Sequence, residues 1–331
     1  MRARGGLPAD QGGRGNAFPR IDRMILTVCL SPSIDVTVEV DALEVGKTNI
    51  ARRKRRRPGG KALNVALGVA RLGGDALVTG FMYRENAETF EELLDRGGVK
   101  HSFIMTEGRV RENYKFIDHR SMLTEVNDVG AEVPAENLEK LLERVRRLSA
   151  VSRVTVISGG LPRGVDASYY GDLFRAVAPG SLRVADATGG KLNAAVSAGV
   201  DLVKPNLGEL ENCIGREMTC RQDMLDACRE LVRRGAKTVL LSLGKEGAIL
   251  TDGKENYYCR STSVAVNSTV GAGDAMVAAA AMKMAEGAPM PEILRAGTAA
   301  GTAAVTTFDE IAFPREKYQE ILESLQVKRL F

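Results

Sequence analysis

The sequence predicts an α/β protein whose central, mostly parallel sheet is flanked by helices on both faces, with a small β-sheet beside it. From about residue 60 onward, short runs rich in β-branched residues alternate with amphipathic stretches, which is typical of βαβ units. One such stretch, 134–148, carries leucines at helical spacing behind a proline. Near the N-terminus, residues 34–40 instead alternate apolar and polar side chains, which indicates a strand exposed on one face.

The expected elements follow in order along the chain. The first strand is Met24–Leu30, which is apolar throughout and therefore typical of a strand covered on both faces. The alternating strand at 34–40 comes next and suggests a small separate sheet. Further strands are expected at Ala76–Phe81, Val151–Ser158, Leu182–Asp186, Leu202–Lys204 and Thr238–Leu243. Ligands of such sheets bind at the carboxyl ends of the strands, so the turns that follow strands are where a site is expected.

The sequence divides into a tail and one domain. Residues 1–23 are rich in glycine and arginine without an apolar period, which predicts a disordered tail. Residues 24–331 show no internal repeat and no linker, so we expect one domain.

Composition excludes several classes of protein. Hydrophobic residues make up 44% and charged residues 27%, with a formal charge of +4, as in ordinary soluble enzymes. Five cysteines without CxxC spacing and only two histidines argue against a zinc site or a disulfide scaffold, and favour a reducing cytoplasm. No apolar run reaches transmembrane length. The absence of tryptophan argues against a stacking platform for nucleic acid.

The strongest chemical signal is the segment STVGAGD at 268–274, which opens an alanine-rich helical run. Bare backbone N–H groups at such a helix start favour an anion. Asp274 beside a bound phosphate could accept the proton of an attacking hydroxyl. The alternative is that Asp274 only caps the helix.

Two weaker motifs follow the same logic. Gly59-Gly60-Lys61 precedes a helical run, which lets the backbone approach a ligand and adds a positive charge there; a plain turn is the alternative. Asn206 and Glu209 lie three apart where a helix begins after a strand. They could share a hydrated Mg²⁺ or form a capping box.

The motifs together resemble the PfkB (ribokinase-like) carbohydrate kinases from about residue 24 to the end. Within that family, residues 32–35 (PSID), Lys61 and 111–113 (REN) look most like the branch of 1-phosphofructokinases and tagatose-6-phosphate kinases. The matching segments appear in the family's order and are 59–66 (GGKALNVA), 158–164 (SGGLPRG), 203–206 (VKPN) with Glu209, 242–248 (SLGKEGA) and 269–274 (TVGAGD).

The resemblance implies a ribokinase-like fold and ATP-dependent phosphoryl transfer with Mg²⁺. It implies that Asp274 is the base for the sugar hydroxyl and that the amides of Gly271, Ala272 and Gly273 stabilise the transferring group. It also implies a β-lid formed from about 33–57 and 102–127. Because this lid is often a dimer contact in relatives, we expect a homodimer through it.

The resemblance also assigns the two ends of the site. On the acceptor side, Asp35 would bind sugar hydroxyls, and Lys61 and Arg111 would hold the phosphate already on the sugar. On the nucleotide side, Asn206 and Glu209 would position Mg²⁺ on ATP. The remaining implied positions are Gly60 and Asn64 for the acceptor, and Lys204, Asn206, Ser242, Gly244, Gly247, Thr269 and the loop around Thr306–Phe308 for ATP.

The acceptor is left open by three departures from the branch pattern, at Ser31, Ala62 and Gly160, all expected on the sugar side. The first expectation is fructose 1-phosphate, giving fructose 1,6-bisphosphate. The alternatives are tagatose 6-phosphate, fructose 6-phosphate, or an unphosphorylated sugar or nucleoside. The cations Lys61 and Arg111 favour a phosphorylated acceptor, because a neutral sugar would leave buried charges unpaired.

A different class of function is suggested by the basic run RRKRRR at 52–57. A catalytically silent sugar-phosphate sensor could bind DNA through it. The intact GAGD motif argues against this, since a sensor needs no base, and no helix-turn-helix pattern is evident. We therefore expect a small sugar phosphate as partner, no nucleic acid and no membrane, and interpret the run as a solvated strand or an attraction for anionic substrates. Lys115 and His119 are expected to be surface residues.

Overall fold

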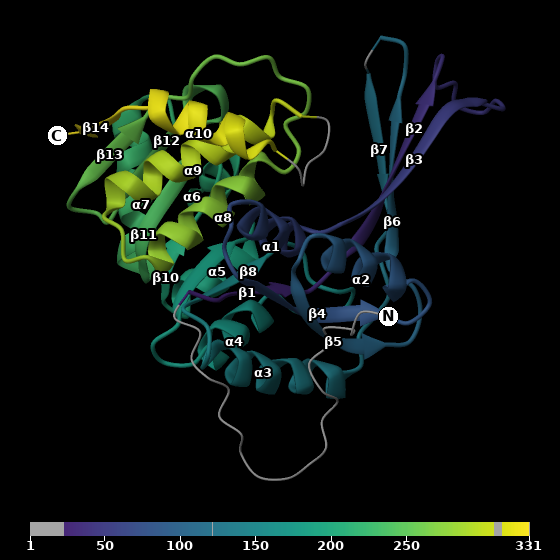
Figure 1. The fold of residues 1–331 in the computed structure, drawn as a ribbon, viewed down its shortest axis with the longest axis horizontal. Coiled ribbons are helices and arrows are strands. Elements are labelled where there is room, and N and C mark those ends of the chain that lie inside the picture. The colour runs from purple at the N-terminus through teal and green to yellow at the C-terminus, as the bar shows by residue number, and fades with distance from the viewer. Residues whose placement is uncertain (1–22, 121, 308–312, 331) are drawn as a thin grey trace.

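The computed structural model describes residues 23–120, 122–307 and 313–330. Figure 1 shows a central sheet with helices on both sides, from which a small second sheet projects. Apart from Arg23, the tail predicted at 1–23 lies outside the described residues. None of the helices in these ranges is long and apolar enough to cross a membrane.

The central sheet contains ten strands. They are β1 (Ile25–Cys29), β4 (Ala76–Tyr83), β5 (Lys100–Thr106), β8 (Val154–Ser158), β9 (Leu182–Asp186), β10 (Val200–Val203), β11 (Ala236–Ser242), β12 (Ala248–Thr251), β13 (Asn256–Cys259) and β14 (Val327–Leu330). Their order is β14-β13-β12-β11-β10-β9-β8-β1-β4-β5, and the pairs from β11 to β5 are all parallel. The three strands beyond β11 are antiparallel. The mostly parallel sheet expected from the sequence is confirmed.

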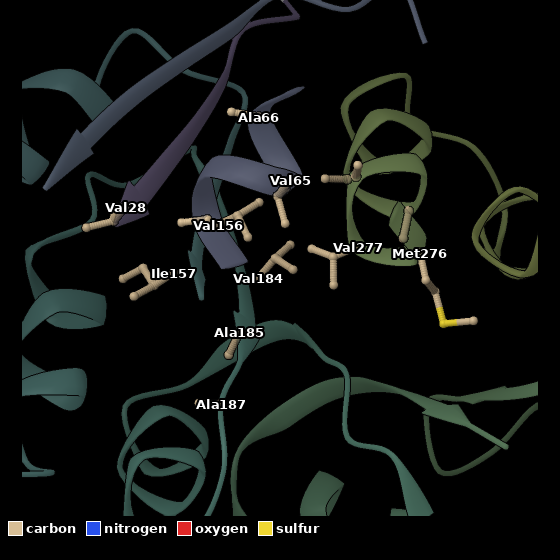
Figure 2. Close-up of a cluster of buried hydrophobic side chains, with 14 of the residues drawn as sticks. Val28, Val65, Ala66, Val156, Ile157, Val184, Ala185, Ala187, Met276 and Val277 are labelled. Carbon is tan, nitrogen blue, oxygen red and sulfur yellow. The ribbon is translucent and has the colours of Figure 1, made fainter. Parts of the chain in front are cut away.

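Helices cover both faces of this sheet. They are α1 (Lys61–Arg71), α2 (Ala87–Arg96), α3 (Ala135–Ser149), α4 (Tyr169–Ala176), α5 (Gly190–Ser197), α6 (Leu207–Ile214), α7 (Arg221–Arg234), α8 (Ala272–Ala285), α9 (Met290–Ala304) and α10 (Arg315–Ser324), with a short 3₁₀ helix η1 (Gly244–Glu246). Helices α1, α8, α9 and α10 pack together in one layer, and α3, α4, α5 and α7 in the other. Figure 2 shows the core between sheet and first layer, where Val156 and Val184 meet Val65 of α1 and Val277 of α8.

The point where the chain changes direction across the sheet positions the site. From β1 the sheet grows through β4 and β5 on one side and through β8 to β11 on the other. The chain segments that follow β1 and β8 therefore leave the carboxyl ends of these two neighbouring strands in opposite directions. Such a topological switch point opens a crevice in which ligands bind.

The small sheet stands at this crevice. It consists of β2 (Ser33–Val40), β3 (Ala51–Gly59), β6 (Arg111–Ile117) and β7 (Leu123–Asn127), in the order β3-β2-β6-β7. The lid segment expected at 102–127 begins too early, because 102–106 belong to β5 and pair with β4 in the central sheet. The basic run at 52–57 lies in β3, with all but Arg57 exposed.

Candidate active site

A cavity of about 1170 Å³ lies between the small sheet and the carboxyl ends of the central strands. Apart from the loop expected at 306–308, the site residues predicted from the sequence line this cavity. They are Asp35, Gly60, Lys61, Asn64, Arg111, Lys204, Asn206, Glu209, Ser242, Gly244, Gly247, Thr269, Gly271, Ala272, Gly273 and Asp274. Segments far apart in the sequence are thus brought together around one cavity.

Asp274 lies in the first turn of α8, where it is 6% exposed. Asn64 of α1 donates a hydrogen bond of 2.8 Å from Nδ2 to its Oδ2. Burial, and next the charge of Asp186, raise the pKa of Asp274 to about 7, against the opposing effects of Asn64, Lys61 and Lys204. A carboxylate with such a pKa is well matched to accept a proton from a hydroxyl near neutral pH.

Asp186, at the end of β9, was missed in the sequence analysis. Its carboxylate is fully buried and accepts a hydrogen bond of 3.0 Å from Ser158 Oγ. Lys61 Nζ lies 3.4 Å from Oδ2, and Lys204 Nζ lies 3.2 Å from Oδ1. Burial alone would raise the pKa of Asp186, but the two ammonium groups outweigh it and hold the pKa below its usual range. An aspartate ending a predicted buried strand, at the edge where ligands bind, was the signal that could have identified it.

Lys204 connects this buried carboxylate to the start of α8. It is 4% exposed, and its Nζ lies 3.2 Å from the position that a Cβ on Gly273 would take. The ammonium group of Lys204 therefore lies beside the backbone at the N-terminus of α8. A helix N-terminus with a neighbouring cation favours the binding of a phosphate group.

Asp35 lies on the cavity side of the small sheet. Its Oδ1 accepts hydrogen bonds from Asn113 Nδ2 at 3.2 Å and from Ser33 Oγ at 3.4 Å, and its Oδ2 lies 3.0 Å from Lys115 Nζ. The expectation that Lys115 is a surface residue is wrong, because its side chain is 15% exposed and lines the cavity. The parallel pairing of β6 with β2, which the sequence does not specify, turns this lysine inward.

Arg111 is the first residue of β6 and also lines the cavity. Its Nη1 donates to the carbonyl of Asp128 at 3.2 Å, while its Nε is buried without a hydrogen-bond partner. The guanidinium lines the cavity and forms no ion pair with a carboxylate of the described residues, so its charge favours an anion bound in the cavity. His119, by contrast, is exposed and contacts the backbone carbonyl of Asp41, in agreement with the surface location expected for it.

Asn206 and Glu209 form the capping box that was the alternative interpretation of their spacing. Asn206 Oδ1 accepts from the Glu209 backbone N–H at 2.8 Å, and Glu209 Oε2 accepts from the Asn206 N–H at 2.9 Å. Both residues also line the cavity, and the carboxylate of Glu209 has a second oxygen. Among the described residues, no three His, Cys, Asp or Glu side chains are grouped to hold a metal. One carboxylate beside a phosphate site fits Mg²⁺, which usually keeps several waters.

The opposite end of the cavity is lined by small and aliphatic residues. Ser242 ends β11, and Gly244 and Gly247 flank the turn formed by η1. Val305 also lines this end, close to the expected loop at 306–308, whose last residue lies outside the described ranges. Further lining residues here include Val264, Met276, Thr298, Gly301 and Thr302.

Two of the three departures from the branch pattern lie side by side. A Cβ on Gly160 would stand 3.8 Å from Ser31 Cβ, and both residues line the cavity. Ala62 is fully buried in α1 and is not among the lining residues. The departures at Ser31 and Gly160 are therefore the ones that change the cavity wall.

Comparison with known proteins identifies the family. The pfkB family of carbohydrate kinases matches residues 25–316. The chain is 32% identical to 1-phosphofructokinase of Rhodobacter capsulatus, covering 92% of this chain and 98% of that protein. It is 29% identical to 1-phosphofructokinase of Vibrio cholerae, covering 93% and 98%. It is also similar to the tetrameric inhibited form of phosphofructokinase-2 from Escherichia coli, with a TM-score of 0.83, 31% identity and coverage of 91% and 98%. The chain therefore belongs to the pfkB family of carbohydrate kinases.

Proposed function

We propose that this protein transfers the γ-phosphoryl group of ATP to a hydroxyl of a ketohexose phosphate, with fructose 1-phosphate as the first candidate and fructose 1,6-bisphosphate as product. The observation that carries the proposal is a buried carboxylate, Asp274, whose pKa is raised to about 7 at the N-terminus of α8. It stands in one cavity between a polar sheet face suited to a sugar and a wall of small residues suited to a nucleotide.

We assign a part in the reaction to each of these groups. Asp274 accepts the proton of the acceptor hydroxyl as its oxygen bonds to the γ-phosphorus, and ADP leaves with the bridging oxygen. The amides of 271–273 and the ammonium of Lys204 stabilise the charge on the phosphoryl oxygens. Asp186 stays ionised and holds Lys204 and Lys61 in place.

Magnesium fits beside Glu209. When bound there with ATP, Mg²⁺ would neutralise part of the phosphate charge. The capping box fixes the Asn206 and Glu209 side chains at the cavity wall, so their orientation does not depend on the metal.

The function is tested with a panel of acceptors. The purified chain is given MgATP with fructose 1-phosphate, fructose 6-phosphate, tagatose 6-phosphate and fructose; ADP release is measured, and the position of the new phosphate is determined by NMR. We expect phosphorylated ketohexoses to be used with a much higher kcat/KM than fructose. Faster turnover of fructose, or of a nucleoside, would contradict the proposal.

We also propose that two copies of the chain associate through the small sheet. Within the described ranges, most of the large hydrophobic side chains that are exposed belong to this sheet and its loops. They are Val45, Ile50, Met122, Leu123, Val126 and Val129. Such a concentration of exposed apolar surface is typical of an interface.

A further inference from the structure

The cavity face of the small sheet carries polar side chains from three neighbouring strands. Asp35 of β2 is paired in register with Asn113 of β6, and Lys115 follows two residues later on the same face. Asn127 and Glu125 of β7 continue this face. The arrangement places one cation of β6 against a carboxylate of β2.

The Asp35 carboxylate already has most of its acceptor capacity occupied. An ionised carboxylate offers about four lone-pair positions. Asn113 and Ser33 donate to Oδ1, and Lys115 donates to Oδ2. About one position therefore remains, on Oδ2, and its direction is set by the side chains that fill the others.

Lys115 and Arg111 differ in whether their positive charge is already paired with a carboxylate. The side chains of Lys115 and Asp35 are 15% and 19% exposed, and the pair largely cancels its own charge. Arg111 also lines the cavity, but it forms no ion pair with a carboxylate of the described residues. An acceptor phosphate is thus attracted chiefly by Arg111, while the Asp35–Lys115 pair is left to bind a neutral hydroxyl.

We propose that Lys115 is a positioning residue that determines which ketohexose is accepted. Lys115 and Asn113 hold the Asp35 carboxylate in one orientation, so that it binds a sugar hydroxyl in one configuration and discriminates against the epimer. This inference rests on the proposed function and adds to it the group that distinguishes sugar epimers, the Asp35 carboxylate held by Lys115.

The test uses pairs of acceptors that differ only in configuration at C4, namely the 1-phosphates and the 6-phosphates of fructose and tagatose. The kcat/KM ratio between epimers is measured for the full-length chain and for Lys115→Met, with saturating MgATP. We expect the substitution to lower this epimer ratio about tenfold or more, because a charge-assisted hydrogen bond that orients the carboxylate is lost. The preference for phosphorylated over unphosphorylated sugar should change less than threefold.

Two matched variants separate this role from general damage. Lys115→Arg keeps the charge and should retain the epimer ratio within a few-fold. Arg111→Ala should raise KM for every phosphorylated acceptor about ten- to hundredfold while leaving the epimer ratio unchanged. The KM for ATP and the melting temperature of each variant show whether the rest of the protein is intact.

The outcomes are distinct. An unchanged epimer ratio in Lys115→Met, or a wild-type chain that does not distinguish the epimers, would overturn the inference while leaving the proposed function in place. Loss of discrimination in Arg111→Ala rather than in Lys115→Met would also overturn it. If no ketohexose phosphate is phosphorylated at all, the proposed function itself fails.

Discussion

Asp274 illustrates how the environment of one residue sets the chemistry of the site. Its carboxylate is buried beside a second carboxylate, Asp186, and both effects favour the neutral form. The hydrogen bond from Asn64 and the two nearby lysines oppose them. The result is a group that changes its charge near neutral pH, as a general base requires.

For Asp274→Asn, we expect kcat to fall by about two to four orders of magnitude because the proton acceptor is removed. ATP binding should remain nearly unchanged. In the wild type the active form is the ionised one, so kcat/KM should fall as the pH drops below about 7, the value to which the pKa is raised. The pH profile of kcat/KM for both proteins checks this. Near-normal kcat in the variant would remove Asp274 from the base role.

Glu209 can be tested separately from its structural part. In Glu209→Gln the capping box is retained, because glutamine also accepts the N-cap hydrogen bond. The negative charge beside the expected cation is lost, so we expect the Mg²⁺ concentration for half-maximal rate to rise several-fold. A magnesium titration at fixed ATP measures it. An unchanged titration would leave Glu209 with only a capping role.

At the scale of elements, the turn between β11 and β12 depends on a close approach of two backbones. Gly247 has φ of 98°, and a Cβ there would lie 2.0 Å from the carbonyl oxygen of Cys259 in β13. Gly244, at the other end of η1, has φ of 58° and nothing within 4 Å of such a Cβ. The two glycines therefore differ in steric surroundings while both adopt positive φ.

This difference predicts unequal effects of the same substitution. Gly244→Ala should cost about 1–2 kcal/mol through backbone strain alone. Gly247→Ala should cost about 3 kcal/mol or more and raise KM for ATP, because the added Cβ would displace Arg260 and Ser261, which line the cavity. Thermal unfolding and ATP kinetics of both variants provide the comparison. Equal effects would show that the contact with Cys259 is not limiting.

The exposed apolar surface of the small sheet allows the proposed association of two copies of the chain to be tested. Val126→Asp places a charge in the exposed apolar surface of β7, where Val126 is 56% exposed. We expect the wild type to be dimeric and the variant monomeric at the same concentration, because burying an unpaired charge opposes association. Light scattering after gel filtration measures the mass. Val266→Asp, at 62% exposure outside this sheet, is the matched control and should leave the mass unchanged.

At the scale of the whole molecule, the proposed acceptor site lies between the two sheets, since residues of both line the cavity. A ligand at one hundred times its Kd raises the free energy of unfolding by about 2.7 kcal/mol, or about 4 °C in Tm for a chain of this size. Fructose 1-phosphate and ATP should each stabilise the wild type in this way. In Arg111→Ala, we expect the shift with the sugar phosphate to be largely lost and the shift with ATP to remain. Loss of the Tm increase with ATP instead would mean that the acceptor and nucleotide ends of the cavity are assigned the wrong way round.

The sequence by itself determined the parallel centre of the sheet, the carboxyl ends of the predicted strands to within two residues, and the motifs that follow them. These are local properties, since hydrophobic period, glycine content and helix-start residues are set by neighbours in the chain. The GAGD segment and the Asn206–Glu209 pair could therefore be placed at helix starts without knowledge of the fold, and the structure has both there.

The tertiary structure decided what those segments face. The resemblance implied that 102–127 belong to the lid, but 102–106 are part of β5, whose pairing with β4 places them in the central sheet. Lys115 enters the cavity because β6 pairs with β2, which is distant in sequence. Asp186 acquires its low pKa from Lys61 and Lys204, which come from other elements. Strand register and long-range charge contacts arise only when distant segments meet, so a single sequence specifies the parts of this site but not their partners.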